Sequence, residues 1–128
     1  RREYPEVSFA VVGAIVSGLM GISPTETEGR VATLPRLTEP LSHVQIASLP
    51  VHGNTIDVRH NGLAETVLTN RSGKTLTWVA GFHGTGSIEV DGVATNGKPG
   101  QDKSGRTFTW AEVAVPTGLS KTTRLKAR

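Results

Sequence analysis

The chain contains no cysteine among its 128 residues. This absence excludes a disulfide framework, a thiolate zinc site and a cysteine nucleophile. Aromatic residues are also scarce, at 5% of the chain, with two Trp, one Tyr and three Phe. A single hydrophobic core in a domain of this length needs most of them. We therefore expect most of the aromatic side chains to be buried.

Strong charge of one sign is also lacking. The formal net charge is only +3, and the basic excess lies after residue 97, chiefly in the C-terminal Lys121, Arg124, Lys126 and Arg128. These side chains could neutralise only a handful of phosphates, which gives weak affinity at physiological salt. Nucleic acid is therefore not expected as a partner.

No apolar run is long enough to favour a membrane span. Residues 7–25 carry no charge and follow Arg1 and Arg2, as in a signal peptide or an anchor. The apolar part nevertheless ends by Ile22, short of the roughly 20 residues that a spanning helix needs, and glycine and serine dilute it. A membrane-tethered structural sandwich, anchored by residues 7–22, is kept as a third alternative.

The same segment has the signals of a helix. Pro5 and Glu6 suit a first helical turn, and Gly21 followed by Pro24 is typical of a helix end. The helix would be uncharged all round, with large apolar side chains on one surface and small ones on the other. Such a helix must be covered on both sides. We expect its partner to lie outside this chain, which begins with Arg1 rather than Met and is expected to be an excised or processed piece.

From residue 31 onward the hydrophobic period changes to two, which is typical of strands. Turn formers such as Asn61-Gly62 and Asp91-Gly92 separate the apolar segments, and the stretch 96–105 is expected to be a long loop. The fold class is therefore predicted as mainly β, an antiparallel β-sandwich at residues 30–128 preceded by one N-terminal α-helix and a connector at residues 1–29. The expected strands lie at residues 30–34, 43–49, 55–60, 64–70, 75–82, 87–90, 107–115 and 121–125.

Two strands allow predictions of side-chain direction. Leu76, Trp78, Ala80 and Phe82 should share one face of their strand, with Thr77 and Val79 on the other. In the strand at 107–115 the parity changes between Trp110 and Val113. A bulge near Ala111-Glu112 would place Phe108, Trp110 and Val113 together in the core.

Motifs for catalysis or metal binding are weak. Residues 92–98 match the phosphate-loop pattern G-x-x-x-x-G-K, but Pro99 replaces the hydroxyl residue and no helix follows, so a hairpin connection is favoured. The four histidines (His43, His52, His60 and His83) lack the spacing of a metal site, so neither a metal nor a cofactor is expected. Asn70-Arg71-Ser72 is a glycosylation sequon that also suits a turn.

Carbohydrate chemistry leaves two pairs of candidates. Trp78 and Trp110 could stack on sugar rings, although packing is the favoured interpretation, more so for Trp78. Glycoside hydrolysis needs two carboxyl groups across the scissile bond. Most acids here are expected on turns or solvent faces, and only Glu6, beside Tyr4, lies where a pocket rim could form. We assign no catalytic residue.

The chain resembles the C-terminal end of bacterial glycoside hydrolases built on a six-hairpin α-toroid, in which the last barrel helix is followed by a β-sandwich. The residues that carry the resemblance are mostly packing and turn residues: Tyr4-Pro5-Glu6 with Ser8, Gly18-Leu19-Met20-Gly21-Ile22 with Pro24, Leu34-Pro35-Arg36-Leu37, Leu49-Pro50-Val51, Gly53-Asn54, Ile56, Val58-Arg59-His60, Gly62, Leu68-Thr69-Asn70 and Val90-Asp91-Gly92.

The resemblance implies a noncatalytic segment that stabilises or caps a catalytic α-toroid in another domain or chain. Carbohydrate substrate would reach it only through that partner, and only Tyr4 and Glu6 could lie near the pocket rim. A secreted or periplasmic location in a bacterium is favoured over a cytoplasmic one. The alternative function is an autonomous carbohydrate-binding module that uses Trp110 or Trp78.

Overall fold

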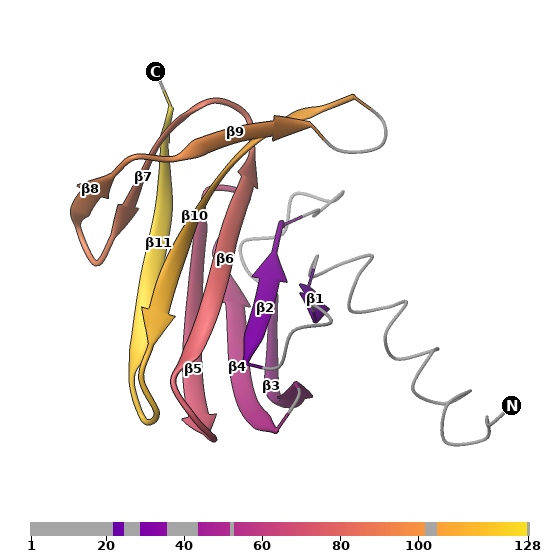
Figure 1. The fold of residues 1–128 in the computed structure, drawn as a ribbon. Helices are drawn as coiled ribbons and strands as arrows, with labels where there is room; N and C mark the ends of the chain where they lie inside the picture. The colour runs from indigo at the N-terminus through magenta and orange to yellow at the C-terminus, as the bar shows by residue number, and fades with distance from the viewer. Residues whose placement is uncertain (1–21, 25–28, 36–43, 52, 102–104, 128) are drawn as a thin grey trace, which may run out of the picture.

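The computed structural model describes residues 22–24, 29–35, 44–51, 53–101 and 105–127. These residues form β-strands joined by turns and loops, without a helix, and the strands are stacked in two layers (Figure 1). In chain order the strands are β1 (Ile22–Pro24), β2 (Arg30–Thr33), β3 (Val44–Val51), β4 (Asn54–His60), β5 (Glu65–Ser72), β6 (Leu76–His83), β7 (Gly86–Val90), β8 (Val93–Thr95), β9 (Lys98–Gln101), β10 (Thr107–Val115) and β11 (Ser120–Ala127).

One layer is a five-stranded sheet in the order β1-β2-β6-β10-β9, and the other is a six-stranded sheet in the order β3-β4-β5-β11-β7-β8. The expected mainly β fold of two layers is confirmed. It is not purely antiparallel, because β2 runs parallel to β6, with Val31 opposite Trp78. The expected N-terminal helix up to residue 21 lies outside the described residues, whereas Ile22 belongs to β1.

Each of the eight expected strands overlaps an observed strand. Three short strands were not expected, namely β1, β8 and β9. Strand β9 lies inside the stretch expected to be a loop, where it pairs with β10. Strand β1 comes before residue 30, where the sandwich was expected to start, and it contributes the core residue Ile22, which is 1% exposed.

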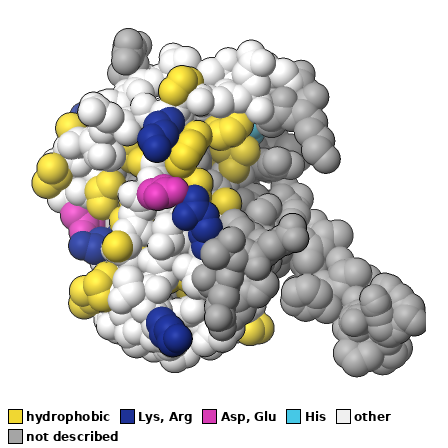
Figure 2. All heavy atoms as spheres, in the orientation of Figure 1, with side chains coloured by type: hydrophobic (Ala, Val, Ile, Leu, Met, Phe, Trp, Pro, Cys, Tyr) yellow, Lys and Arg dark blue, Asp and Glu magenta, His cyan; other side chains and the backbone are white. Residues whose placement is uncertain are grey.

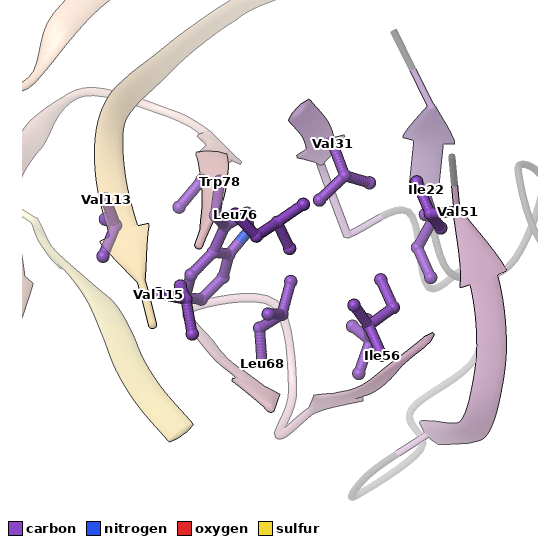
Figure 3. Close-up of a cluster of buried hydrophobic side chains, with 11 residues drawn as sticks. Ile22, Val31, Val51, Ile56, Leu68, Leu76, Trp78, Val113 and Val115 are labelled. Atoms are coloured by element: carbon purple, nitrogen blue, oxygen red, sulfur yellow. The ribbon is translucent and has the colours of Figure 1, made fainter. Parts of the chain in front are cut away.

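The main core lies between the two sheets, and Trp78 is its largest side chain (Figure 3). Leu76, Trp78, Ala80 and Phe82 are all fully buried, which confirms the predicted inward face of β6. Opposite them, Leu68 of β5 and Ile56 of β4 point into the same space from the six-stranded sheet. A second cluster of Phe82, Ile88 and Ala111 continues the core toward β7.

A buried polar network joins strand ends within the sandwich. Asn70 Nδ2 donates hydrogen bonds to the carbonyl oxygens of Lys74 and Val115, both at 2.9 Å. Asn54 Nδ2 donates to the Lys74 carbonyl at 2.8 Å and to Asn70 Oδ1 at 3.1 Å. Because Asn54 and Asn70 are at most 4% exposed, their buried amides need partners within the protein, and the network supplies them. The network fixes the turn after β5 against the end of β10.

The turn between β7 and β8 has the geometry that its sequence predicts. Val90 pairs with Val93, so Asp91 and Gly92 form a two-residue loop. Their φ angles are 51° and 85°, both in the left-handed region. An Asp-Gly pair of this kind is typical of a type I′ hairpin turn, whose twist matches that of the flanking strands.

Candidate functional site

The outer face of the five-stranded sheet depends on the register of β10. Its pairing with β6 runs without a shift from Phe108 opposite His83 to Val115 opposite Leu76. The expected bulge near Ala111-Glu112 is therefore absent, and that prediction was wrong. An unbroken strand alternates its side chains, so Thr109, Ala111, Val113 and Val115 are buried and Phe108 and Trp110 point outward.

Trp110 contacts the edge strand β9. It lies opposite Lys98 in the pairing of β10 with β9, and the Lys98 ammonium nitrogen is 5.0 Å from the centroid of the indole ring. A cation at this distance over an aromatic face is attracted by the ring quadrupole. The half-buried indole therefore contacts Lys98, a side chain of the same sheet.

Phe108 contacts the same strand. Its cross-strand partner is Gly100, and a Cβ atom at position 100 would lie only 2.7 Å from Phe108 Cζ. The ring therefore lies directly over the glycine backbone, an arrangement that protects an edge glycine from water. Together, the contacts of Phe108 and Trp110 explain why the Lys-Pro-Gly sequence of β9 forms a strand.

One ion pair lies on this face. Arg30 Nη2 of β2 donates a 2.5 Å hydrogen bond to Glu112 Oε2 of β10. The hydrogen bond and the positive charge of Arg30 hold the pKa of Glu112 below its ordinary value. A general acid for glycoside hydrolysis needs the opposite, a raised pKa. Glu112 therefore has the properties of an ion-pair partner and not those of a general acid.

The remaining outward side chains of this sheet are mostly apolar. Ala32 lies opposite Val79, and Leu34 Cδ1 lies 3.5 Å from the position of a Cβ at Gly81. Figure 2 shows hydrophobic side chains gathered on this side of the molecule around charged ones of both signs. We call this set the apolar face; its members are Ala32, Leu34, Val79, Phe108, Trp110 and Ala114.

The outer face of the six-stranded sheet has a different character. Arg71 pairs with Asp57 at 2.8 Å and Arg124 pairs with Glu65 at 2.5 Å. A further ion pair joins Lys126 to Glu89, and beside this face Lys121, opposite the buried Leu68, pairs with Asp91 of the β7–β8 turn. Arg124 and then Asn61 donate hydrogen bonds that lower the pKa of Glu65. This side is charged, as the solvent face of a sandwich normally is.

The other residues that the sequence offers as candidates for binding or modification are buried in the fold or lie outside the described residues. Trp78 is fully buried and its Nε1 donates a 2.9 Å hydrogen bond to Thr33 Oγ1, so it presents no face to a sugar. The buried amide of Asn70 holds the Lys74 and Val115 carbonyls, which leaves the sequon inaccessible in the folded protein. Tyr4 and Glu6 lie outside the described residues.

No metal centre is formed by the described part of the chain, where no three His, Asp or Glu side chains gather. His60 is buried and its Nδ1 forms a 2.8 Å hydrogen bond with Thr66 Oγ1. Residues 92–98 form a hairpin and the start of β9, as expected of a connection and not of a phosphate loop. Across the described ranges, no helix is long and apolar enough to cross a membrane.

The fold and its outer faces thus define a two-layer β-sandwich with one charged and one largely apolar outer face. No protein-family profile, curated protein or solved structure matches the chain. Sequence reasoning did not find the roles of Phe108, Lys98 or the Arg30–Glu112 pair. Only the parity change in the strand at 107–115 signalled that part of β10 faces outward.

Proposed function

We propose that this chain is the noncatalytic C-terminal β-sandwich segment of a bacterial glycoside hydrolase, in which it stabilises or caps a catalytic α-toroid. The two-layer β fold is the one that the resemblance implies for residues 30–128. The toroid, supplied by another domain or chain, binds and cleaves the carbohydrate. The sandwich itself contributes packing.

The observation that carries this proposal is the ion pairing of the carboxylates. Every acidic side chain in the described part of the chain is paired with a Lys or Arg; these residues are Asp57, Glu65, Glu89, Asp91 and Glu112. The pKa values of Glu65 and Glu112 are lowered by these contacts. Hydrolysis of a glycoside requires one carboxyl group that stays protonated and a second one across the bond. Ion-paired carboxylates on strand surfaces fit a structural role better.

The residues that carry the resemblance also have structural roles. Asn54 and Asn70 belong to the buried amide network, and His60 is hydrogen-bonded inside the sheet. Asp91 and Gly92 form the tight hairpin turn. Residues shared with an enzyme family for folding are expected in an accessory domain, whereas shared reactive residues are expected in its catalytic body.

The coding sequence upstream of Arg1 tests the proposal. We expect several hundred residues with helical periodicity, rich in Trp and acidic residues. A different fold pattern upstream, or an upstream polypeptide that hydrolyses no glycoside when joined to this chain, would contradict it.

A second candidate function is carbohydrate binding through Trp110. It is favoured by the position of Trp110 on the outer face, at the end of the apolar face near β9. Its test is a glycan array with the wild-type chain, Trp110→Ala and Trp78→Ala. Binding that is lost in Trp110→Ala supports this second function. Absence of glycan binding in the wild type, with lowered stability in Trp78→Ala, favours the accessory-segment proposal.

A further inference from the structure

The chain contains two Asn-Gly pairs, Asn61-Gly62 and Asn96-Gly97, and the fold holds them differently. In such a pair the backbone nitrogen of the glycine can attack the side-chain carbonyl carbon of the asparagine. Glycine shields this nitrogen least, because it has no Cβ atom. The attack requires the asparagine side chain and the backbone to turn toward each other. Contacts that hold the asparagine therefore decide whether the pair reacts.

Asn61 is held through both polar atoms of its side chain. Arg59 Nε donates a 2.7 Å hydrogen bond to Asn61 Oδ1, and Asn61 Nδ2 donates a 2.8 Å hydrogen bond to Glu65 Oε1. The backbone N–H of Asn61 also donates to the Glu65 carbonyl at 2.9 Å, which closes the turn between β4 and β5. Asn61 is half-buried. A reaction at its side chain requires these bonds to open first.

Asn96 is exposed, and no hydrogen bond joins its side chain to another described residue. It lies in a two-residue link between strands of different sheets (Figure 1). The pairing of β8 ends with Thr95 opposite Ile88, and the pairing of β9 begins with Lys98 opposite Trp110. Asn96 is therefore held neither by a strand ladder nor by a side-chain contact.

Packing requires the glycine that follows Asn96. A Cβ atom at position 97 would clash with Cγ2 of Thr109, which is only 4% exposed, and would lie 3.6 Å from Ile88 Cγ1. A larger residue, whose side chain would shield the backbone nitrogen, does not fit here. The fold thus places an exposed asparagine directly before a glycine that it cannot replace.

We propose that Asn96 is a site of spontaneous deamidation in the folded protein, and that the contacts of Asn61 protect it from the same reaction. The Gly97 backbone nitrogen forms a bond to Asn96 Cγ and gives up its proton, while the Cγ–Nδ2 bond breaks and ammonia leaves. Water then opens the cyclic imide at either carbonyl, which yields aspartate or isoaspartate. Both products place a carboxylate two residues before Lys98 and lower the formal net charge of +3 by one. Isoaspartate also lengthens the main chain by one carbon at the crossing between the sheets.

The experiment stores the wild-type chain at mildly alkaline pH, folded and in concentrated urea, and measures conversion of each asparagine by peptide mapping with mass spectrometry. In urea both Asn-Gly pairs lose their native contacts, so their rates should agree within about threefold. In the folded chain Asn96 should convert at least about tenfold faster than Asn61, because the hydrogen bonds of Asn61 must open first. Asn96→Ser should remove the less basic species that cation-exchange chromatography separates from the stored wild type.

Glu65→Ala tests the protection of Asn61. It removes the acceptor of Asn61 Nδ2 and should speed conversion at Asn61 without changing Asn96. Arg124→Gln is the matched control, because it removes the other partner of Glu65 and leaves the acceptor in place. Melting curves establish that both variants are folded during storage.

Two results would overturn the proposal. One is equal conversion of Asn61 and Asn96 in the folded wild type, and the other is an unchanged Asn96 in the folded chain while the urea sample converts. An Asn61 that stays as slow in Glu65→Ala as in Arg124→Gln would refute the protective role of its hydrogen bond to Glu65.

Discussion

The indole Nε1 of Trp78 donates a 2.9 Å hydrogen bond to Oγ1 of Thr33 inside the core. The bond joins β6 to β2, the parallel pair of the five-stranded sheet, and Thr33 is only 2% exposed. The large central side chain of the sandwich is therefore held by a polar contact as well as by packing.

Replacing Thr33 with Val tests this contact. The buried indole N–H would lose its acceptor, so unfolding free energy should fall by about 1 to 3 kcal/mol. Thr77→Val, at a half-buried outward position of β6, is the control and should change stability by less than about 0.5 kcal/mol. Urea denaturation measures both. Equal effects of the two substitutions would show that the hydrogen bond contributes little.

Asn70→Ala tests the buried amide network. The substitution leaves the Val115 carbonyl without its side-chain donor and removes one of the two acceptors of Asn54 Nδ2. We expect a loss of about 3 kcal/mol or more, because several buried polar groups lose partners together. Asn61→Ala removes a part-buried hydrogen bond to Glu65 and an exposed one from Arg59, and should cost about 1 kcal/mol. A loss at Asn70 no larger than at Asn61 would contradict the structural role of the network.

A comparison of Gly73→Ala with Gly92→Ala distinguishes the cost of backbone strain from the cost of a steric clash. Both have positive φ, 105° and 85°, so alanine is strained at either position. A Cβ at Gly73 would also lie 2.6 Å from Asn54 Nδ2 and 2.8 Å from the Gly53 carbonyl oxygen, whereas at Gly92 nothing lies within 4 Å. Gly73→Ala should therefore lower the melting temperature more than Gly92→Ala, by about 4 °C or more. Similar shifts would mean that Asn54 and the Gly53 carbonyl move aside without loss.

The contact of Glu65 with Arg124 predicts a pH dependence. The hydrogen bond from Arg124, followed by that from Asn61, lowers the pKa of Glu65 in the folded protein. A lowered pKa stabilises the fold above the unfolded pKa, and this stabilisation is lost as pH falls through the folded value. Glu65→Gln should therefore be less stable than wild type at neutral pH, and the difference should shrink as the pH falls below the ordinary pKa of a glutamate.

Arg124→Gln provides the control for this titration. Without Arg124, the effect of Glu65→Gln should be smaller and should vary less with pH. Denaturation curves across the pH range decide the question, and a Glu65→Gln effect that is constant with pH would count against the ion pair as its source.

The sequence predicted much of the fold because most strands alternate clearly. The inward face of β6, with Leu76 and Trp78, follows from period-two patterning alone. Strand β9 could not be predicted in this way, because Pro99 and Gly100 disfavour strands and its pairing depends on Phe108 and Trp110 across the sheet. The parallel pairing of β2 with β6 likewise depends on tertiary packing.

The candidate site was less predictable, and β10 shows why. Patterning identifies which side chains share a face but not which face is inside when both carry apolar residues. Patterning therefore predicts a bulge that puts Val113 and Trp110 in one core, whereas the structure places them on opposite faces. An outer face that contains Trp110 can be found only once the register is known.

The central claim is that this sandwich completes a glycosidase without performing catalysis. Its most direct test measures hydrolysis of a panel of glycosides by two samples, the chain alone and the longer polypeptide encoded with its upstream region. Hydrolysis is predicted only for the longer polypeptide, with a kcat that Glu65→Gln and Glu112→Gln leave unchanged. Hydrolysis by the isolated chain, abolished by either substitution, would contradict this function.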